Sequence, residues 1–130
     1  MKLLSFNSAR YLTLAIPCIL AMTSLAPRSA LAIAAPDARA VCSAAGVLNA
    51  VRSENVVLCQ RLAAGQYRVR INNNVTRCTF VATLGISAIG VPPAGEIGVA
   101  PRAAANEVLI RTRNSGGATV DQPFHLFVAC

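Results

Sequence analysis

Titratable side chains are scarce in this sequence, and this scarcity limits the chemistry that the protein can perform. The chain of 130 residues contains one histidine, five acidic residues and no tryptophan. It lacks a C-x-x-C pair, a second histidine and a glycine-rich phosphate loop. Aromatic residues make up 5% of the chain, so few rings are available to stack on nucleic-acid bases. We therefore expect no enzyme, no metal site, no cofactor and no nucleic-acid partner.

Charge is also low, and hydrophobic residues are abundant. Charged residues account for 13% of the chain and hydrophobic residues for 55%. This balance excludes an intrinsically disordered chain. The length allows one small domain and argues against two independent cores.

The first 32 residues have the layout of an export signal. A positively charged start precedes an uncharged apolar stretch over residues 11–26. Sixteen residues of helix span less than the roughly 30 Å hydrocarbon core of a bilayer, and Pro17 interrupts them. Small residues at Ala30 and Ala32 fit a signal peptidase site, so we expect a cut after Ala32, with Ala40 as the alternative.

The expected mature chain is residues 33–130, without a permanent membrane span. A flexible lead over 33–40 should precede a single β domain over 41–130. All its cations are arginines, nine against five acidic residues. We expect a secreted or periplasmic protein.

Four cysteines remain after such a cut: Cys42, Cys59, Cys78 and Cys130. An even number in a small exported domain indicates disulfides, and four cysteines allow three pairings. Cys42 and Cys59 lie in neighbouring N-terminal segments, whereas Cys78 and Cys130 lie in the two most apolar ones. We expect the pairs Cys42–Cys59 and Cys78–Cys130.

The mature chain has the pattern of short strands separated by turns. Residues 66–72 and 107–113 alternate between apolar and polar side chains, which predicts half-buried strands. Residues 75–84 are almost continuously apolar, which predicts a strand buried on both faces. The loop tip after 113 suggests a hairpin to 118–121 or to 124–130. The sequence predicts an all-β fold, a small antiparallel β-sandwich or partly open barrel, with further strands at 41–47, 55–62, 96–100 and 124–130.

Three motifs in the second half of the chain resemble a known group of proteins. They are Gly65-x-Tyr67-x-Val69-x-Ile71, Val75-x-x-Cys78-x-x-Val81-Ala82-Thr83-x-Gly85 and Pro123-Phe124-His125-Leu126-x-Val128-x-Cys130. The pattern resembles small exported bacterial proteins and C-terminal modules that have no established activity. The resemblance covers about half of the chain. It implies export and a β-rich fold, and it supports pairing Cys78 with Cys130.

The one histidine could belong to a hydrolase triad of Ser87, His125 and Asp121. The segment Gly85–Gly90 superficially resembles a nucleophile elbow, but it has one residue too many and no strand–turn–helix context. The preferred interpretation is a structural or exposed histidine on the strand face opposite Phe124 and Leu126.

Arginines provide the strongest indication of binding. Arg68 and Arg70 project from one face of a predicted strand, and Arg111 and Arg113 project from one face of another. If the two strands are neighbours, the four guanidinium groups form a patch suited to phosphate, sulfate or carboxylate. The patch could extend to Arg61 or Arg77. The alternative is a solvated face that keeps the protein soluble, and we favour it.

The apolar side chains of residues 86–99 are expected to cover one end of the sandwich. The preferred hypothesis for function is a non-catalytic binding or structural module at the cell envelope or outside the cell. Its ligand could be an anionic glycan or another envelope component. An exported inhibitor or effector acting on a protein partner is the alternative, and a hydrolase with an unrecognised site is the third hypothesis.

Overall fold

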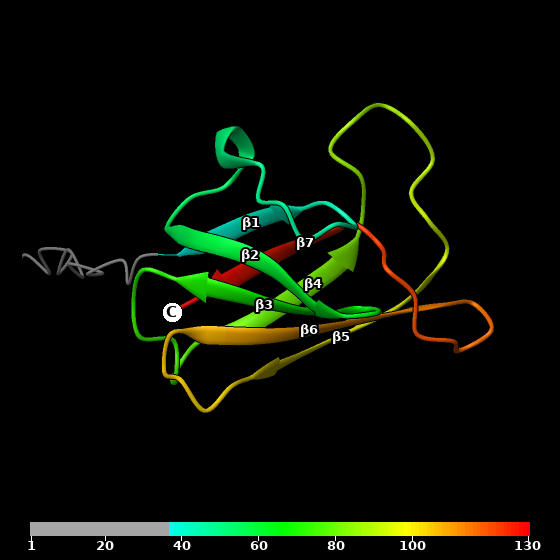
Figure 1. The fold of residues 1–130 in the computed structure, drawn as a ribbon. Coiled ribbons are helices and arrows are strands. Elements are labelled where there is room, and N and C mark those ends of the chain that lie inside the picture. Colours follow the sequence, from blue (N-terminus) through cyan, green and yellow to red (C-terminus); the bar gives the residue numbers. More distant parts are fainter. Residues whose placement is uncertain (1–36) are drawn as a thin grey trace, which may run out of the picture. The chain divides into compact units, whose positions relative to one another are not determined.

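Residues 37–130 are described by the computed structural model, and their strands form two antiparallel sheets packed as a sandwich (Figure 1). The smaller sheet has the order β1-β7-β4 and the larger has the order β2-β3-β6-β5. This confirms the expected all-β sandwich. The predicted signal segment 1–32 and the cut after Ala32 lie outside the described residues. The elements are β1 (Ala38–Cys42), the 3-10 helix η1 (Ala50–Arg52), β2 (Val56–Ala63), β3 (Gln66–Ile71), β4 (Thr79–Leu84), β5 (Gly95–Pro101), β6 (Glu107–Asn114) and β7 (Phe124–Ala129).

The core lies between the two sheets and is built from alternate residues of the strands. Alternation with a period of two sends every second side chain inward. The Tyr67 and Phe124 rings meet from opposite sheets with their centroids 5.1 Å apart. The other large buried side chains are those of Val69, Ile71, Val108, Ile110, Thr112 and Val128.

Two disulfides hold the sandwich together. Cys42–Cys59 joins β1 to β2 and therefore links the two sheets, with a Cα–Cα distance of 6.3 Å. Cys78–Cys130 ties the chain just before β4 to the last residue after β7, with a Cα–Cα distance of 4.3 Å. These are the two pairs expected from the sequence. Disulfides persist in oxidising surroundings, so they indicate an extracytoplasmic location.

The N-terminal boundary of the β domain lies earlier than expected. β1 starts at Ala38, within the segment 33–40 that was expected to be a flexible lead. Ala38 and Ala40 are buried and pair with Val128 and Leu126 of β7. The sequence pattern did not predict a strand at these positions, since alanine has a low propensity for β-strands. Cleavage after Ala40 would remove most of β1.

The prediction of a doubly buried strand over 75–84 was wrong. β4 begins at Thr79, after a turn, and its side chains alternate between exposed and half-buried. β4 is an edge strand of the smaller sheet. Val81 lies on the outer face of this sheet, opposite Phe127 of β7, and both side chains are exposed there. Continuous apolarity therefore did not mean burial on both faces.

The last strand does not form a hairpin with β6. The other expected partner, residues 118–121, does meet the end of β6: Arg113 bridges to Thr119, and the Asn114 amide donates to the Ala118 carbonyl at 2.9 Å. The chain then crosses to the other sheet. There β7 inserts between β1 and β4 as the central strand. Its inward residues Phe124, Leu126 and Val128 are buried, as the sequence predicts.

The crossing segment is held by polar contacts at Asp121. The Asp121 carboxylate accepts hydrogen bonds from Arg61 Nε and from the Gly65 amide, both at 2.7 Å. Gly65 has φ of +59°, and a Cβ there would meet the Thr112 carbonyl oxygen. Tyr67 Oη accepts from the Gln122 amide at 3.1 Å and donates to the Ala44 carbonyl at 2.9 Å. This network anchors the turn from one sheet to the other.

We expect this network to make stability sensitive to acid. The hydrogen bond from Arg61, and then that from the Gly65 amide, hold the pKa of Asp121 below its ordinary value of 3.8. A depressed carboxyl pKa stabilises the fold above the unfolded value, and this stabilisation is lost as the pH falls through the folded value. Urea unfolding of the wild type and Asp121→Asn from pH 7 to pH 2 measures it. The wild type should lose more stability below about pH 4 than the variant; parallel curves would refute this role.

Candidate anion-binding surface

The structure brings the two arginine strands together on the outer face of the larger sheet. β3 and β6 are hydrogen-bonded neighbours, although β4 and β5 lie between them in the sequence. Their register sets Arg70 opposite Glu107 and Arg68 opposite Leu109. Arg111 lies opposite Gln66, further along the same face. The four arginines of the predicted patch therefore share one face but divide into two groups.

The first group, Arg68 and Arg70, shares the carboxylate of Glu107, which offsets only part of its positive charge. Glu107 Oε1 accepts hydrogen bonds from Arg68 Nη1 at 3.3 Å and from Arg70 Nη2 at 3.1 Å. Arg102 Nε lies 3.6 Å from Glu107 Oε2. The Glu107 side chain is 7% exposed, so these three guanidinium groups enclose it. Arg68 also donates to Gln60 Oε1. This end of the face is organised internally as an ion-pair cluster.

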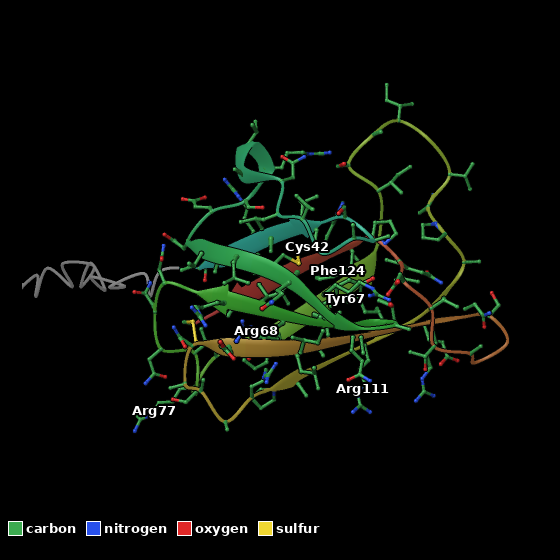
Figure 2. The ribbon with its side chains drawn as sticks, in the orientation of Figure 1. Cys42, Tyr67, Arg68, Arg77, Arg111 and Phe124 are labelled. Carbon is green, nitrogen blue, oxygen red and sulfur yellow. A yellow bond between two sulfur atoms is a disulfide. The ribbon has the colours of Figure 1, made fainter. Side chains whose placement is uncertain are left out.

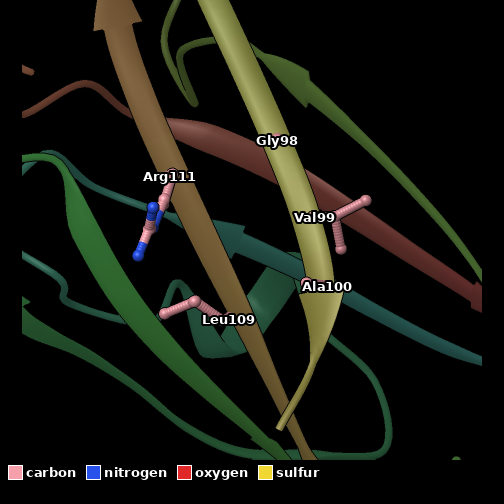
Figure 3. Close-up of a pocket in the computed structure, with 5 residues that line it drawn as sticks. All are labelled: Gly98, Val99, Ala100, Leu109 and Arg111. Atoms are coloured by element: carbon pink, nitrogen blue, oxygen red, sulfur yellow. The ribbon is translucent and has the colours of Figure 1, made fainter.

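The second group, Arg111 and Arg113, remains available to a ligand. Both side chains are exposed, and neither forms an ion pair within residues 37–130. Gly98 of β5 lies opposite Arg111, and Ala100 lies opposite Leu109. These small residues leave a hollow of about 350 Å³ beside the two larger side chains. In Figure 3, Arg111 and Leu109 point to one side of the sheet and Val99 points to the other.

A second hollow, of about 210 Å³, extends the first along the same strands. Glu96, Gly98, Arg111 and Arg113 contribute to its lining. Arg111 and Gly98 therefore border both hollows. Glu96 lies opposite Arg113 in the register and is the acidic residue of this part of the face. We call Arg111, Arg113, Leu109, Gly98 and Ala100 the β5–β6 site.

Arg61 and Arg77 do not extend this site. Arg61 is bound to Asp121 near the crossing segment. Arg77 is exposed in the turn before β4, and its side chain points away from the sandwich at the end opposite Arg111 (Figure 2). The extension considered from the sequence is therefore absent from the described residues.

The structure does not assemble the hypothetical hydrolase triad: Asp121 has other partners, and the buried His125 Nε2 has no hydrogen-bond partner within the described residues. Asp121 is bound to Arg61 and Gly65, and the Ser87 carbonyl accepts from Arg52 Nη1 at 2.8 Å. His125 is half-buried on the outer face of the smaller sheet, beside Gly85. No hydrogen bond joins any two members of the triad within the part of the chain that the structure describes.

Two features of the face could not be found without knowing which strands lie on either side of β6, β3 for the first and β5 for the second. Alternation already placed Glu107 on the same side of its strand as Arg111 and Arg113. Alternation does not show which strand lies next to β6. Because that strand is β3, Glu107 contacts Arg68 and Arg70. The hollow likewise depends on the register of β5 with β6, which sets Gly98 directly opposite Arg111.

Comparison with protein-family models, curated proteins and solved structures finds no match for this chain. The protein is therefore described by its fold alone, as a small disulfide-bonded β-sandwich. The resemblance to small exported bacterial proteins remains a prediction from the sequence motifs.

Proposed function

We propose that this protein is an exported, non-catalytic binding module that holds an anionic glycan or a similar envelope component at the β5–β6 site. The observation that carries the proposal is the pair of exposed guanidinium groups beside an open hollow. Within residues 37–130, Arg39, Arg61, Arg68, Arg70 and Arg102 each lie in an ion pair with a carboxylate. Of the four that do not, Arg52, Arg77, Arg111 and Arg113, only Arg111 and Arg113 share one strand and border the hollows.

The shape and chemistry of the site suit a sugar that carries carboxylate or sulfate. A guanidinium group binds such oxyanions through two parallel hydrogen bonds. Gly98 and Ala100 let a ring approach the sheet closely, and Leu109 supplies an apolar contact. The ion-pair cluster around Glu107 adds a rigid border at the other end of the face.

Export supports the same proposal. The N-terminal segment has the composition of a signal peptide, and the two disulfides fit an oxidising compartment. We infer a secreted or periplasmic protein of bacterial origin, where anionic polysaccharides are accessible ligands.

Calorimetry with heparin, a sulfated polysaccharide, tests the site at low ionic strength. Arg111→Ala should weaken binding by about tenfold to a hundredfold, since a hydrogen bond to a charged group contributes about 1.5–3 kcal/mol. Arg77→Ala is the matched control, because it removes the same charge from an exposed position at the other end of the domain. Equal losses in both variants would indicate attraction by net charge alone and would refute the site.

Glu96→Gln provides a second control, in which the affinity for heparin should rise instead of fall. Removing this carboxylate should strengthen heparin binding, because Glu96 repels an anion held by Arg113.

A further inference from the structure

Three aliphatic side chains are almost completely exposed to solvent. Val51 is 96% exposed, Ile89 is 107% exposed and Val91 is 91% exposed. The expectation that the apolar residues of 86–99 cover one end of the sandwich is wrong for Ile89 and Val91. Ile97 and Val99 belong to strand β5 and pack against the core. Unlike Ile97 and Val99, these three side chains contribute little to folding.

The three side chains belong to two segments that are joined. Val51 lies in η1, and Ile89 and Val91 lie in the loop between β4 and β5. Arg52 Nη1 in η1 donates to the Ser87 carbonyl of that loop at 2.8 Å. Both segments project from the same side of the sandwich in Figure 1. We call Val51, Ile89 and Val91 the aliphatic tips.

The surface next to the aliphatic tips is apolar and carries positive charge. A groove of about 250 Å³ on the outer face of the smaller sheet is bordered by Arg52 and includes the exposed side chains of Val81 and Phe127. Arg39 and His125 also line it, and no lining residue is acidic. Of these, Arg39 forms an ion pair with Glu54 at 2.7 Å. The loop from Gly85 to Ala94 contains no charged residue.

We propose that the aliphatic tips dock this domain on the surface of a lipid bilayer that contains anionic headgroups. Projecting aliphatic side chains enter the boundary between headgroups and acyl chains without needing a shaped pocket. Arg52 lies beside the tips, where it meets headgroup phosphates. Nine arginines against five acidic residues in 33–130 give the domain the complementary overall charge. A few shallow side chains provide weak, reversible and salt-sensitive attachment.

This docking surface is separate from the β5–β6 site. The aliphatic tips and the groove belong to η1, the loop after β4 and the smaller sheet, whereas Arg111 and Arg113 lie on the outer face of the larger sheet. A domain attached through its tips therefore leaves the β5–β6 site free. Substitutions at the tips and at Arg111 test the two proposals independently.

The absence of tryptophan allows a direct test with a single fluorescent reporter. Ile89→Trp is made in the full chain and titrated with vesicles of phosphatidylglycerol and phosphatidylcholine. The emission maximum should shift to shorter wavelength as the indole enters the interface. The shift should weaken with pure phosphatidylcholine or with added salt. Val57→Trp is the control, because Val57 is also exposed but lies on β2 of the larger sheet.

Three results would overturn the proposal. An unchanged Ile89→Trp spectrum would show that the tips stay in water. Equal shifts in both variants would assign vesicle binding to another part of the chain. A shift that appears without vesicles and grows with protein concentration would mean that a second copy of the chain covers the tips. Circular dichroism confirms that each variant is folded.

Discussion

Replacing Cys78 and Cys130 with alanine should lower the free energy of unfolding by about 4 kcal/mol. The bond closes a loop with a sequence separation of 52 residues, so removing it releases conformational entropy in the unfolded chain. Small domains are stable by about 5–15 kcal/mol, so this loss takes a large part of the total. Guanidinium unfolding followed by far-ultraviolet circular dichroism measures it.

The single variants provide the control for this prediction. Cys78→Ala and Cys130→Ala each break the same bond, so each alone should destabilise the domain about as much as the double variant. The residues contribute little else, because Cys130 is exposed and Cys78 is half-buried. A double variant within about 1 kcal/mol of the wild type would refute the disulfide's role in stability.

Replacing Phe124 with alanine should lower the free energy of unfolding by about 3–5 kcal/mol. The ring is fully buried between the sheets and packs against the ring of Tyr67. Its removal leaves a cavity in the centre of the core, since the flanking strands are held by their ladders and by Cys42–Cys59.

Phe127→Ala is the matched control on the same strand. Phe127 points to the outer face and is half exposed, so its removal should cost less than about 1 kcal/mol. Similar losses in the two variants would contradict the assignment of inner and outer faces on β7. Both are measured by the same denaturant titration.

The two outer faces of the sandwich differ in chemistry, and this difference organises both proposals. The larger sheet presents arginines, Glu107 and glutamines, with the open β5–β6 site at one end. The smaller sheet presents Val81 and Phe127 under the aliphatic tips. The outer faces of a β-sandwich usually carry polar side chains that contact water. The exposed apolar residues on one face therefore indicate a surface that binds a partner.

Several elements could be predicted because their information is local. Alternation in Gln66–Ile71 and Glu107–Asn114 is sufficient to predict strands and their buried faces, since the β period is two everywhere. An even set of cysteines in a small chain indicated disulfides. β1 was placed too late, because Ala38 and Ala40 are too small to give a β signal, although they fit tightly against β7.

The sequence by itself determined the class of fold, the face of each alternating strand and the presence of cross-links. The tertiary structure alone decided which strands are neighbours, and therefore which charges meet. Glu107 forms ion pairs with Arg68 and Arg70 because β6 pairs with β3, a contact between residues 37 and 39 positions apart. Arg111 has no carboxylate opposite it on β5 because its partner there is Gly98. Such long-range pairing depends on packing of the whole chain, and no local pattern encodes it.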